Sequence, residues 1–429
     1  MGTLLSLLEQ RGHELSLEGL SRVDLPKVKA ALAKSLPQMI YADISAVCVD
    51  TAWRVLEYIE HHEFLPVVVG GPYATVDPAG GLSLPGVSAV AIGEPDATLV
   101  TYLERVKDPA TGQIVSGVWL RDESGTAQPD LPELVEDLDS LPVPHRALFR
   151  YAEHIEQTGQ IEMAIGRGCP QSCAYCINNR LRELYENRGV WVRHRSPENI
   201  LDEIDALRRR HDGVRQVRFR DHSFALDGSW LAEFLSLYRR ACGLPFHCHL
   251  RANRASRGAI RELAEAGCEV VDVEVISGSN LIRNEIFEMD LSGEQIRATF
   301  SRLRAAGIRS RAIVYAGSPY ESEASLDDLR VLLRAVRPDV VDVRAYYPWP
   351  GTRARDLCQE QGWLHSRGEE QYRAGNGGID MPACRPSVVA AFIRRLRREM
   401  PTTDAQPWWR RWSFASRTVL GQVFQKRRP

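Results

Sequence analysis

Short runs of β-branched and apolar residues alternate with amphipathic helical patterns along the first 110 residues. The pattern predicts helices over 2–12 and 26–37, and strands over 14–18, 43–49, 65–69 and 87–92. The last two strands run into glycines, at Gly70-Gly71 and at Gly93. Short buried strands that are separated by helices indicate a parallel, doubly wound (Rossmann-like) sheet. We therefore expect an α/β domain over residues 1–110.

A strand-then-helix unit recurs six times between about 160 and 352. The predicted strands cover 162–168, 215–221, 246–251, 269–276, 309–316 and 339–347, and each but the last precedes a helical pattern. Six such units, connected right-handedly, close most of the way to a barrel, with chemistry at the carboxyl ends of the strands. We therefore expect a partial (β/α)6 TIM-type barrel over 156–352, after a hairpin and linker over 111–155. Residues 353–429 are expected to form a small helical region, with a helix near 386–400.

Composition and charge exclude several classes of protein. The 429 residues are 44% hydrophobic, and 54 Lys plus Arg stand against 56 Asp plus Glu, for a net charge of −2. This composition excludes a disordered or repetitive chain, and the near-zero charge gives no overall attraction to nucleic acid or to an acidic membrane. The Trp- and Arg-rich stretch at 408–412 is read as a solvated cap. We find no long apolar run and no secretory leader, and expect a cytoplasmic protein.

Three of the nine cysteines lie within eight residues, directly after the first barrel strand. Cys169, Cys173 and Cys176 form a Cys-x3-Cys-x2-Cys loop. Three thiolates on one loop can hold three irons of a cubane cluster and leave the fourth iron open. Structural zinc usually takes four ligands as two closely spaced pairs, which this sequence does not offer. The other six cysteines, and the pair His247 and His249, are read as core or surface residues rather than metal ligands.

This loop, with Tyr175 before its third cysteine, resembles the radical S-adenosylmethionine (radical SAM) superfamily, in the branch with an N-terminal cobalamin (B12)-binding-type domain. The resemblance implies a [4Fe-4S] cluster on Cys169, Cys173 and Cys176, with S-adenosylmethionine (SAM) on the open iron. Cleavage of SAM would give a 5′-deoxyadenosyl radical that abstracts a hydrogen atom from a small-molecule substrate. The electron would come from a low-potential donor such as flavodoxin or ferredoxin.

The same resemblance suggests further residues around SAM. Phe219 to Phe224 are similar to the family's Phe-x-Asp-Asp-x-Phe, which implies that Asp221 or Ser223 faces the SAM amino group. Arg251, at the end of the third strand, would pair with a carboxylate. The alternative readings are a helix cap for Asp221 and a plain surface arginine for Arg251.

Two other strand ends match the family with departures. The fourth strand resembles Gly-Ile-Glu-Ser-Gly-Ser and includes Ser277, but Ile276 stands where a glutamate would lie near the SAM ribose. Glu274, on the same face by the strand's period of two, would substitute for it or hold substrate. After the fifth strand, the resemblance implies that backbone at Gly317 and Pro319 meets adenine and that Tyr320, which replaces a glycine, reaches the substrate.

The N-terminal domain resembles a cobalamin-binding domain at Arg11-Gly12, at Gly70-Gly71-Pro72 and at Ile92-Gly93-Glu94. It has no Asp-x-His-x-x-Gly motif to supply a lower ligand. The chain also begins in what would be the domain's first helix, so the first, central strand is missing. Either the true start lies upstream, or the sheet is built without that strand and has lost cobalamin.

Two reactions remain open at this stage. The first is a cobalamin-dependent C-methyltransferase of natural-product biosynthesis. The second is a cobalamin-free dehydratase or epimerase acting on an aminoglycoside or other sugar-like substrate, because Asp221, Asp272 and Glu274 place acids at strand ends. Solvated or capping acids explain that pattern equally well. RNA or protein modification is disfavoured because no docking domain is recognisable, and a non-enzymatic iron-sulfur scaffold is disfavoured because the strand ends fit catalysis.

Overall fold

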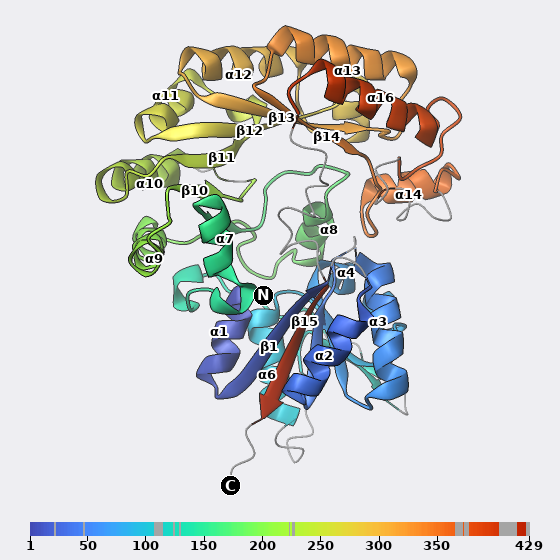
Figure 1. The fold of residues 1–429 in the computed structure, drawn as a ribbon. Helices are drawn as coiled ribbons and strands as arrows, with labels where there is room; N and C mark the ends of the chain where they lie inside the picture. Colours follow the sequence, from blue (N-terminus) through green and yellow to red (C-terminus); the bar gives the residue numbers. More distant parts are fainter. Residues whose placement is uncertain are drawn as a thin grey trace. The chain divides into compact units, whose positions relative to one another are not determined.

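The computed structural model describes residues 1–20, 23–45, 48–106, 115–122, 125–127, 130–222, 224, 228–364, 372, 377–402 and 418–425. The chain divides into two compact units, each with its own sheet (Figure 1). The N-terminal unit comprises residues 1–151, 180–190 and 408–429, and the barrel unit comprises 152–179 and 191–407. The N-terminal unit therefore takes in chain from beyond the barrel, which the sequence did not predict.

The N-terminal unit is a mixed seven-stranded sheet with helices on both faces. The strand order is β1 (His13–Leu20), β15 (Thr418–Gln425), β2 (Met39–Asp43), β3 (Val67–Gly70), β4 (Val87–Ala91), β5 (Val118–Asp122) and β6 (Gly125–Ala127). One apolar cluster lies under α2 (Leu25–Ser35), α3 (Val49–His62) and α5 (Pro78–Leu82), and the other under α1 (Gly2–Gln10) and α6 (Pro95–Val106). The expected doubly wound architecture is confirmed, but the sheet is not wholly parallel as predicted, because β15 and β5 pair antiparallel with their neighbours.

The C-terminal strand β15 lies where the first strand appeared to be missing. It pairs antiparallel with all of β1, from His13↔Gln425 to Leu20↔Thr418, and on its other side with β2 (Figure 1). Among the described strands β1 pairs with no other, so β15 alone attaches it to the sheet. The C-terminal region is therefore not purely helical, and the sheet is completed by chain that follows the barrel.

Two smaller predictions also change. The strand expected over 43–49 is wrong, because β2 ends at Asp43 and α3 begins at Val49. The hairpin expected in the linker is β5 and β6, which extend the N-terminal sheet beside β4. The basic and Trp-rich stretches at 408–412 and 426–428 lie outside the described residues.

The barrel unit is a six-stranded parallel sheet, as predicted. Its order is β14 (Val340–Ala345), β13 (Arg309–Ala316), β12 (Cys268–Ile276), β11 (Phe246–Leu250), β10 (Gln216–Phe219) and β7 (Gln160–Met163). The helices that cover it are α9 (Pro197–Arg210), α10 (Gly228–Ala241), α11 (Arg257–Glu265), α12 (Gly293–Ala305), α13 (Glu323–Val336) and α16 (Pro386–Glu399) (Figure 1). A short antiparallel ladder joins β8 (Gly166–Arg167) to β9 (Arg193–His194), and α8 (Ile177–Leu184) lies between these two strands in the sequence.

Side-chain caps determine where several barrel helices begin. Ser196, Ser256, Ser292 and Ser322 each accept a hydrogen bond from the backbone three residues later, and Ser292 also forms a capping box with Gln295. Such caps satisfy backbone donors that have no partner within the helix.

The remaining α-helices are α4 (Gly71–Val76), α7 (Tyr151–Thr158) and α14 (Arg353–Glu360). In the described parts of the chain, no helix is long and apolar enough to cross a membrane.

Candidate active site

The three-cysteine loop leaves β8 through a turn that only glycine permits. Gly168 has φ +83°, and a side chain there would collide with the carbonyl of Trp191. The Trp191 indole donates to the carbonyl oxygen of Cys169 at 2.9 Å, and Cys176 N donates to Cys173 O at 3.0 Å. The loop is therefore fixed at both ends, with α8 beginning directly after the third cysteine.

All nine cysteines are free thiols, and burial raises the pKa of each thiol in the loop, that of Cys176 to about 12. Iron binds the thiolate, so a bound cluster would remove these protons. Among the described residues, no three His, Cys, Asp or Glu side chains converge on one point suited to a single ion. The donor set is that of a cluster in which each thiolate holds a different iron.

Tyr175, expected next to the cofactor, forms part of an aromatic wall beside the loop. Its ring meets Phe287 edge-on at 5.0 Å and Tyr315 at 5.8 Å between centroids. Burial raises the pKa of its hydroxyl well above the usual value. Tyr175 therefore anchors the loop to β13 and to the turn after β12.

Asp221 is tied to the backbone that leads into the cysteine loop. Its two carboxylate oxygens accept hydrogen bonds from Ile165 N and Gly166 N, both at 2.9 Å. Burial outweighs these bonds and raises its pKa to about 6. The carboxylate links the end of β10 to the chain before β8, so it positions the cluster loop. Its predicted contact with SAM stays a prediction, and Ser223 lies outside the described residues.

Arg251 lies between the cysteine loop and Glu274. Its Nη1 is 3.4 Å from Cys173 Sγ and 3.4 Å from Glu274 Oε2, and its Nη2 donates to Met289 O at 3.2 Å. Only 8% of the residue is exposed, so the reading as a surface arginine is wrong. The predicted pairing with a carboxylate is found within the protein, and it brings a cation to the thiols.

A β-bulge separates Glu274 from Ile276. Glu274 pairs with Ile313 and Ile276 pairs with the next residue, Val314, so one extra residue lies between them on β12. Ile276 has φ +63°, an unusual backbone conformation for a β-branched residue. The expectation that period two places both on one face is therefore wrong. Glu274 alone points toward Arg251 and the cysteines.

The loop after β13 is built around a buried glutamate. Glu321 accepts from Gly317 N at 3.1 Å, Ser318 N at 3.2 Å and Ser325 Oγ at 3.0 Å. Burial raises the pKa of Glu321 to about 7, although these hydrogen bonds and one from Ser277 act to lower it. Gly317 has φ +84°, as a tight turn requires. Ser277 and Glu321 thus shape the backbone that was expected to meet adenine.

Tyr320 and Pro319 follow in the same loop. Pro319 is buried, whereas Tyr320 is 46% exposed and has φ +61°, a conformation that favours the glycine expected there from the family resemblance. The Tyr320 ring lies edge-on to Trp363, with centroids 4.9 Å apart. Its exposure leaves the predicted contact with substrate open.

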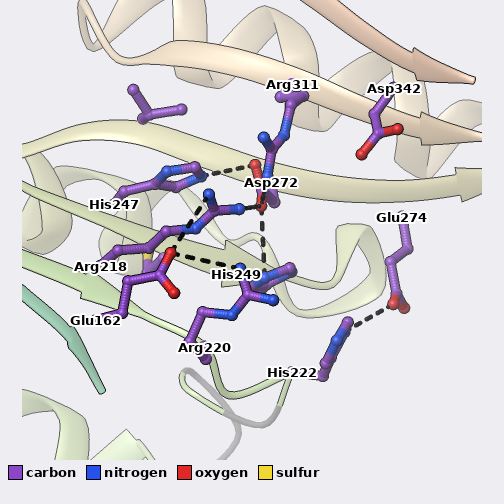
Figure 2. Close-up of polar contacts among 12 residues, drawn as sticks. Glu162, Arg218, Arg220, His222, His247, His249, Asp272, Glu274, Arg311 and Asp342 are labelled. Carbon is purple, nitrogen blue, oxygen red and sulfur yellow. Dashed lines mark hydrogen bonds and ion pairs between the residues drawn. The ribbon is translucent and has the colours of Figure 1, made fainter. Parts of the chain in front are cut away.

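The interior of the barrel is lined with ionisable side chains, which sequence reasoning did not recognise as one group. Asp272, fully buried, accepts from His247 Nε2 at 2.7 Å, from Arg218 Nη2 at 3.3 Å and from Arg311 (Figure 2). His249 Nε2 lies 3.4 Å from the same carboxylate. A carboxylate has about four acceptor positions, so these groups saturate it.

Asp272 is therefore neither solvated nor a cap, and that interpretation is wrong. Burial favours the neutral acid, but the surrounding His and Arg side chains hold the pKa of Asp272 well below its usual range. Burial lowers the pKa of His247 to about 4 and that of His249 well below 6.5, so both are neutral at pH 7. The negative charge of Asp272 is already matched and is not available to attract a cationic sugar.

One sequence signal could have found this network. Acidic, basic and imidazole side chains recur at every second position of barrel strands, where apolar residues normally fill the core. The members are Arg251 and Arg344 together with nine residues labelled in Figure 2, namely Glu162, Arg218, Arg220, His247, His249, Asp272, Glu274, Arg311 and Asp342. The pair His247 and His249 and the acids of β12 are visible in the sequence, but their partners depend on the strand register.

The glycines of the N-terminal unit are required by contacts within the protein. A side chain at Gly70 would collide with the ring of Tyr41, and one at Gly71 (φ +89°) would lie 2.6 Å from Asp43 Oδ1. Thr75 Oγ1 accepts from Gly93 N at 2.9 Å, which ties together the loops after β3 and β4. These loops form the carboxyl edge where doubly wound sheets bind ligands. No described histidine lies in these two loops.

The comparisons with known proteins agree with this arrangement. The model of the Radical SAM superfamily matches residues 163–333. Cytidylyl-2-hydroxyethylphosphonate methyltransferase of Streptomyces wedmorensis is 22% identical over 58% of this chain and 52% of its own length. Anaerobic magnesium-protoporphyrin IX monomethyl ester cyclase of Rubrivivax gelatinosus is 25% identical over 69% of this chain and 53% of its own. The chain spans about half the length of these two relatives.

Two solved structures share the fold at low sequence identity. The radical SAM methyltransferase TsrM of Kitasatospora setae, with cobalamin and a [4Fe-4S] cluster bound, has a TM-score of 0.63 and 17% identity, covering 84% of this chain and 71% of TsrM. The cobalamin-dependent SAM radical enzyme OxsB has a TM-score of 0.59 and 18% identity, covering 73% of this chain and 46% of OxsB. Residues 163–333 are therefore a domain of the Radical SAM superfamily.

Proposed function

We propose that this protein is a cobalamin-dependent radical SAM methyltransferase that methylates a carbon atom of a small molecule in natural-product biosynthesis. The observation that carries the radical chemistry is the loop of three free thiols at the carboxyl end of the barrel, beside a buried arginine and a half-buried glutamate. The finer assignment, methyl transfer with cobalamin, is supported by the fold likeness to cobalamin-bound TsrM and OxsB.

The residues of the site fit the cofactors of this superfamily. Cys169, Cys173 and Cys176 would hold a [4Fe-4S] cluster, which supplies the electron that cleaves SAM to methionine and a 5′-deoxyadenosyl radical. Asp221 holds the start of the loop, and Arg251 places its positive charge 3.4 Å from the Cys173 sulfur. Tyr175, Phe287 and Tyr315 form an aromatic wall that excludes water from the loop. Exclusion of water protects a radical from quenching.

Glu274 extends the site from the cysteines toward the barrel interior. It accepts from His222 Nδ1 at 2.8 Å and faces Arg251. The positive charges of His222 and Arg251 outweigh the effect of burial and hold the pKa of Glu274 below its usual value. We propose that this ionised carboxylate takes over the role of the missing glutamate at Ile276, toward SAM or substrate.

Cobalamin would bind at the carboxyl edge of the N-terminal sheet, next to the loops that begin at Gly71 and Gly93. No described residue of those loops is a histidine, so these two loops would offer the cofactor no imidazole. The remaining partners in this proposal are a small-molecule substrate and a low-potential electron donor such as flavodoxin or ferredoxin.

The test is retention of cobalamin by the anaerobically reconstituted full-length chain. We would add iron, sulfide and hydroxocobalamin, desalt the protein and read its visible spectrum. Stoichiometric retention supports methylation. A Gly71→Val variant, which introduces strain at φ +89°, should then lose cobalamin and keep its iron.

No retention by a protein with a full complement of iron would contradict the methyl-transfer proposal. It would favour the second candidate, a cobalamin-free dehydratase or epimerase of sugar-like substrates. The antiparallel β15 in the place of the first strand is the observation that keeps this candidate open, because it makes the sheet differ from a regular doubly wound one.

A further inference from the structure

The ion network inside the barrel has more positive than negative charge. Three guanidinium groups, those of Arg218, Arg220 and Arg311, face two carboxylates, those of Glu162 and Asp272. Neighbouring acids have cations of their own, since Asp342 pairs with Arg344 and Glu274 lies between His222 and Arg251. Within the described residues, one guanidinium of the network therefore lacks a full counter-charge. Buried charges are normally paired, so such a site favours an anion.

Arg220 is the cation with the weakest pairing. Its Nη1 lies 3.8 Å from Glu162 Oε1, which Arg218 also approaches, at 4.0 Å. The Arg220 side chain is 31% exposed, compared with 8% for Arg218 and 15% for Arg311. Arg220 directly follows β10 and precedes Asp221, so it lies at the carboxyl end of the barrel. It is the guanidinium of the network that a substrate can reach.

Two imidazoles next to Arg220 each have one ring nitrogen that can bind a substrate. The rings of His222 and His249 lie 4.3 Å apart, and Figure 2 shows both beside Arg220. His249 is 7% exposed, and its Nδ1 is buried without a hydrogen-bond partner among the described residues. Because His249 Nε2 faces Asp272, the proton belongs on Nε2 and Nδ1 is an acceptor. His222 donates from Nδ1 to Glu274, so its Nε2 is the nitrogen that can face a substrate.

We propose that Arg220 and His222 bind an oxyanion of the substrate, a carboxylate or a phosphoryl group, while His249 Nδ1 accepts a hydrogen bond from a neighbouring substrate hydroxyl. The inference deepens the proposed function by naming the substrate class, and it rests on that function for the identity of the reaction. It excludes an apolar substrate and a purely cationic sugar. The guanidinium supplies two parallel donors that match the geometry of either oxyanion.

The protonation states agree with these roles. Burial opposes protonation of His222, but the charge and hydrogen bond of Glu274 outweigh it and raise the pKa of His222, which favours the cationic ring that would donate from Nε2 to an oxyanion. Crowding of cations also affects Arg218. Burial and the charge of Arg311 lower the pKa of Arg218 to about 10. An added anion would relieve that repulsion.

The experiment measures binding of two probes, inorganic phosphate and acetate, to the reconstituted full-length protein. Melting temperature is followed against probe concentration at constant ionic strength, with sodium chloride as the reference. A ligand that binds only the folded state raises stability in proportion to its binding. The variants are Arg220→Gln and Arg220→Lys. The matched control is Arg309→Gln, which removes an exposed arginine, paired only with Glu269 among the described residues, from the amino end of β13.

At least one probe should stabilise the wild type and Arg309→Gln. The affinity for that probe should fall at least about tenfold in Arg220→Gln and by less in Arg220→Lys. Stabilisation by phosphate alone identifies a phosphoryl group, and by acetate alone a carboxylate. No stabilisation of the wild type by either probe overturns the proposal. Equal stabilisation of wild type and Arg220→Gln also overturns it, because the anion is then adventitious. Formation of 5′-deoxyadenosine, measured in the same samples, reports separately on the proposed radical chemistry.

Discussion

The two hydrogen bonds of Asp221 allow a quantitative prediction about the cluster loop. Asparagine at this position offers one acceptor oxygen, so either Ile165 N or Gly166 N loses its partner, whereas alanine leaves both unpaired. An unpaired buried donor costs about 1–3 kcal/mol. We therefore expect Asp221→Asn to lower the free energy of unfolding by about 1–3 kcal/mol and Asp221→Ala by about 2–6 kcal/mol. Since burial raises the pKa of Asp221 to about 6, the amide avoids a charge penalty and should fall near the lower limit.

The assay compares urea unfolding with the rate of iron loss to a chelator, at pH 7.5, where Asp221 is ionised. Iron should be lost fastest from the alanine variant and slowest from the wild type, because the loop backbone is released. Asp339→Ala is the matched control for Asp221→Ala, because both hydrogen bonds of Asp339 go to one oxygen that asparagine would keep. Asp339 Oδ2 accepts from Ser310 N at 2.7 Å and Ser310 Oγ at 3.0 Å, at the amino end of β13. That variant should be destabilised similarly but keep iron like the wild type.

The opposite pattern would refute this reasoning. If both Asp221 variants hold iron as firmly as the wild type while their affinity for SAM falls, the carboxylate binds the SAM amino group, as the family resemblance implies, and does not position the loop.

Three further changes test other parts of the structure. Gly168→Ala should reduce bound iron strongly, because the new side chain meets the Trp191 carbonyl. Gly307 also has a positive φ but lies in open space, so Gly307→Ala should keep iron and lower the free energy of unfolding by about 1 kcal/mol. Equal iron in both variants would contradict the loop geometry. Glu321 has its pKa raised from 4.5 to about 7, so its contribution to stability is full below about pH 4.5 and is lost as pH rises through 7. Relative to Glu321→Gln, the free energy of unfolding of the wild type should fall by up to about 3 kcal/mol between pH 4.5 and 8, measured in unfolding titrations. Parallel pH profiles of the two proteins would show that Glu321 does not titrate in this range. Deleting residues 403–429 removes β15, so calorimetry should show earlier unfolding with iron content retained, and an unchanged thermogram would show that β15 does not support the sheet.

The barrel could be predicted from the sequence because its strands are separate buried runs with clear boundaries. Each predicted strand lies within a few residues of an observed one. The strand over 43–49 failed because residues 39–49 form one nearly continuous apolar run, and the change from β2 to α3 within it has no glycine or proline to mark it. The position of β15 could not be predicted, because it pairs with strands about 400 residues away in sequence.

The site was predictable where a motif specifies a spacing, and not where partners meet across strands. The cysteine loop is recognisable from its spacing alone. The partners of Asp221, Arg251 and Asp272 depend on register, and the bulge before Ile276 breaks the alternation on which the placement of Glu274 relied. Ionisable residues at inward positions are individually ambiguous, since only the folded barrel shows that Arg220 lacks a full counter-charge among the residues that the structure describes.

Cleavage of SAM by the reconstituted protein tests the central claim most directly. The full-length chain, reconstituted with iron and sulfide and reduced with dithionite, should convert SAM to 5′-deoxyadenosine and methionine, quantified by chromatography. Cys173→Ala should form neither product, whereas Cys242→Ala, a thiol outside the loop, should match the wild type. Equal 5′-deoxyadenosine formation by Cys173→Ala and the wild type, or none by an iron-replete wild type, would contradict the account.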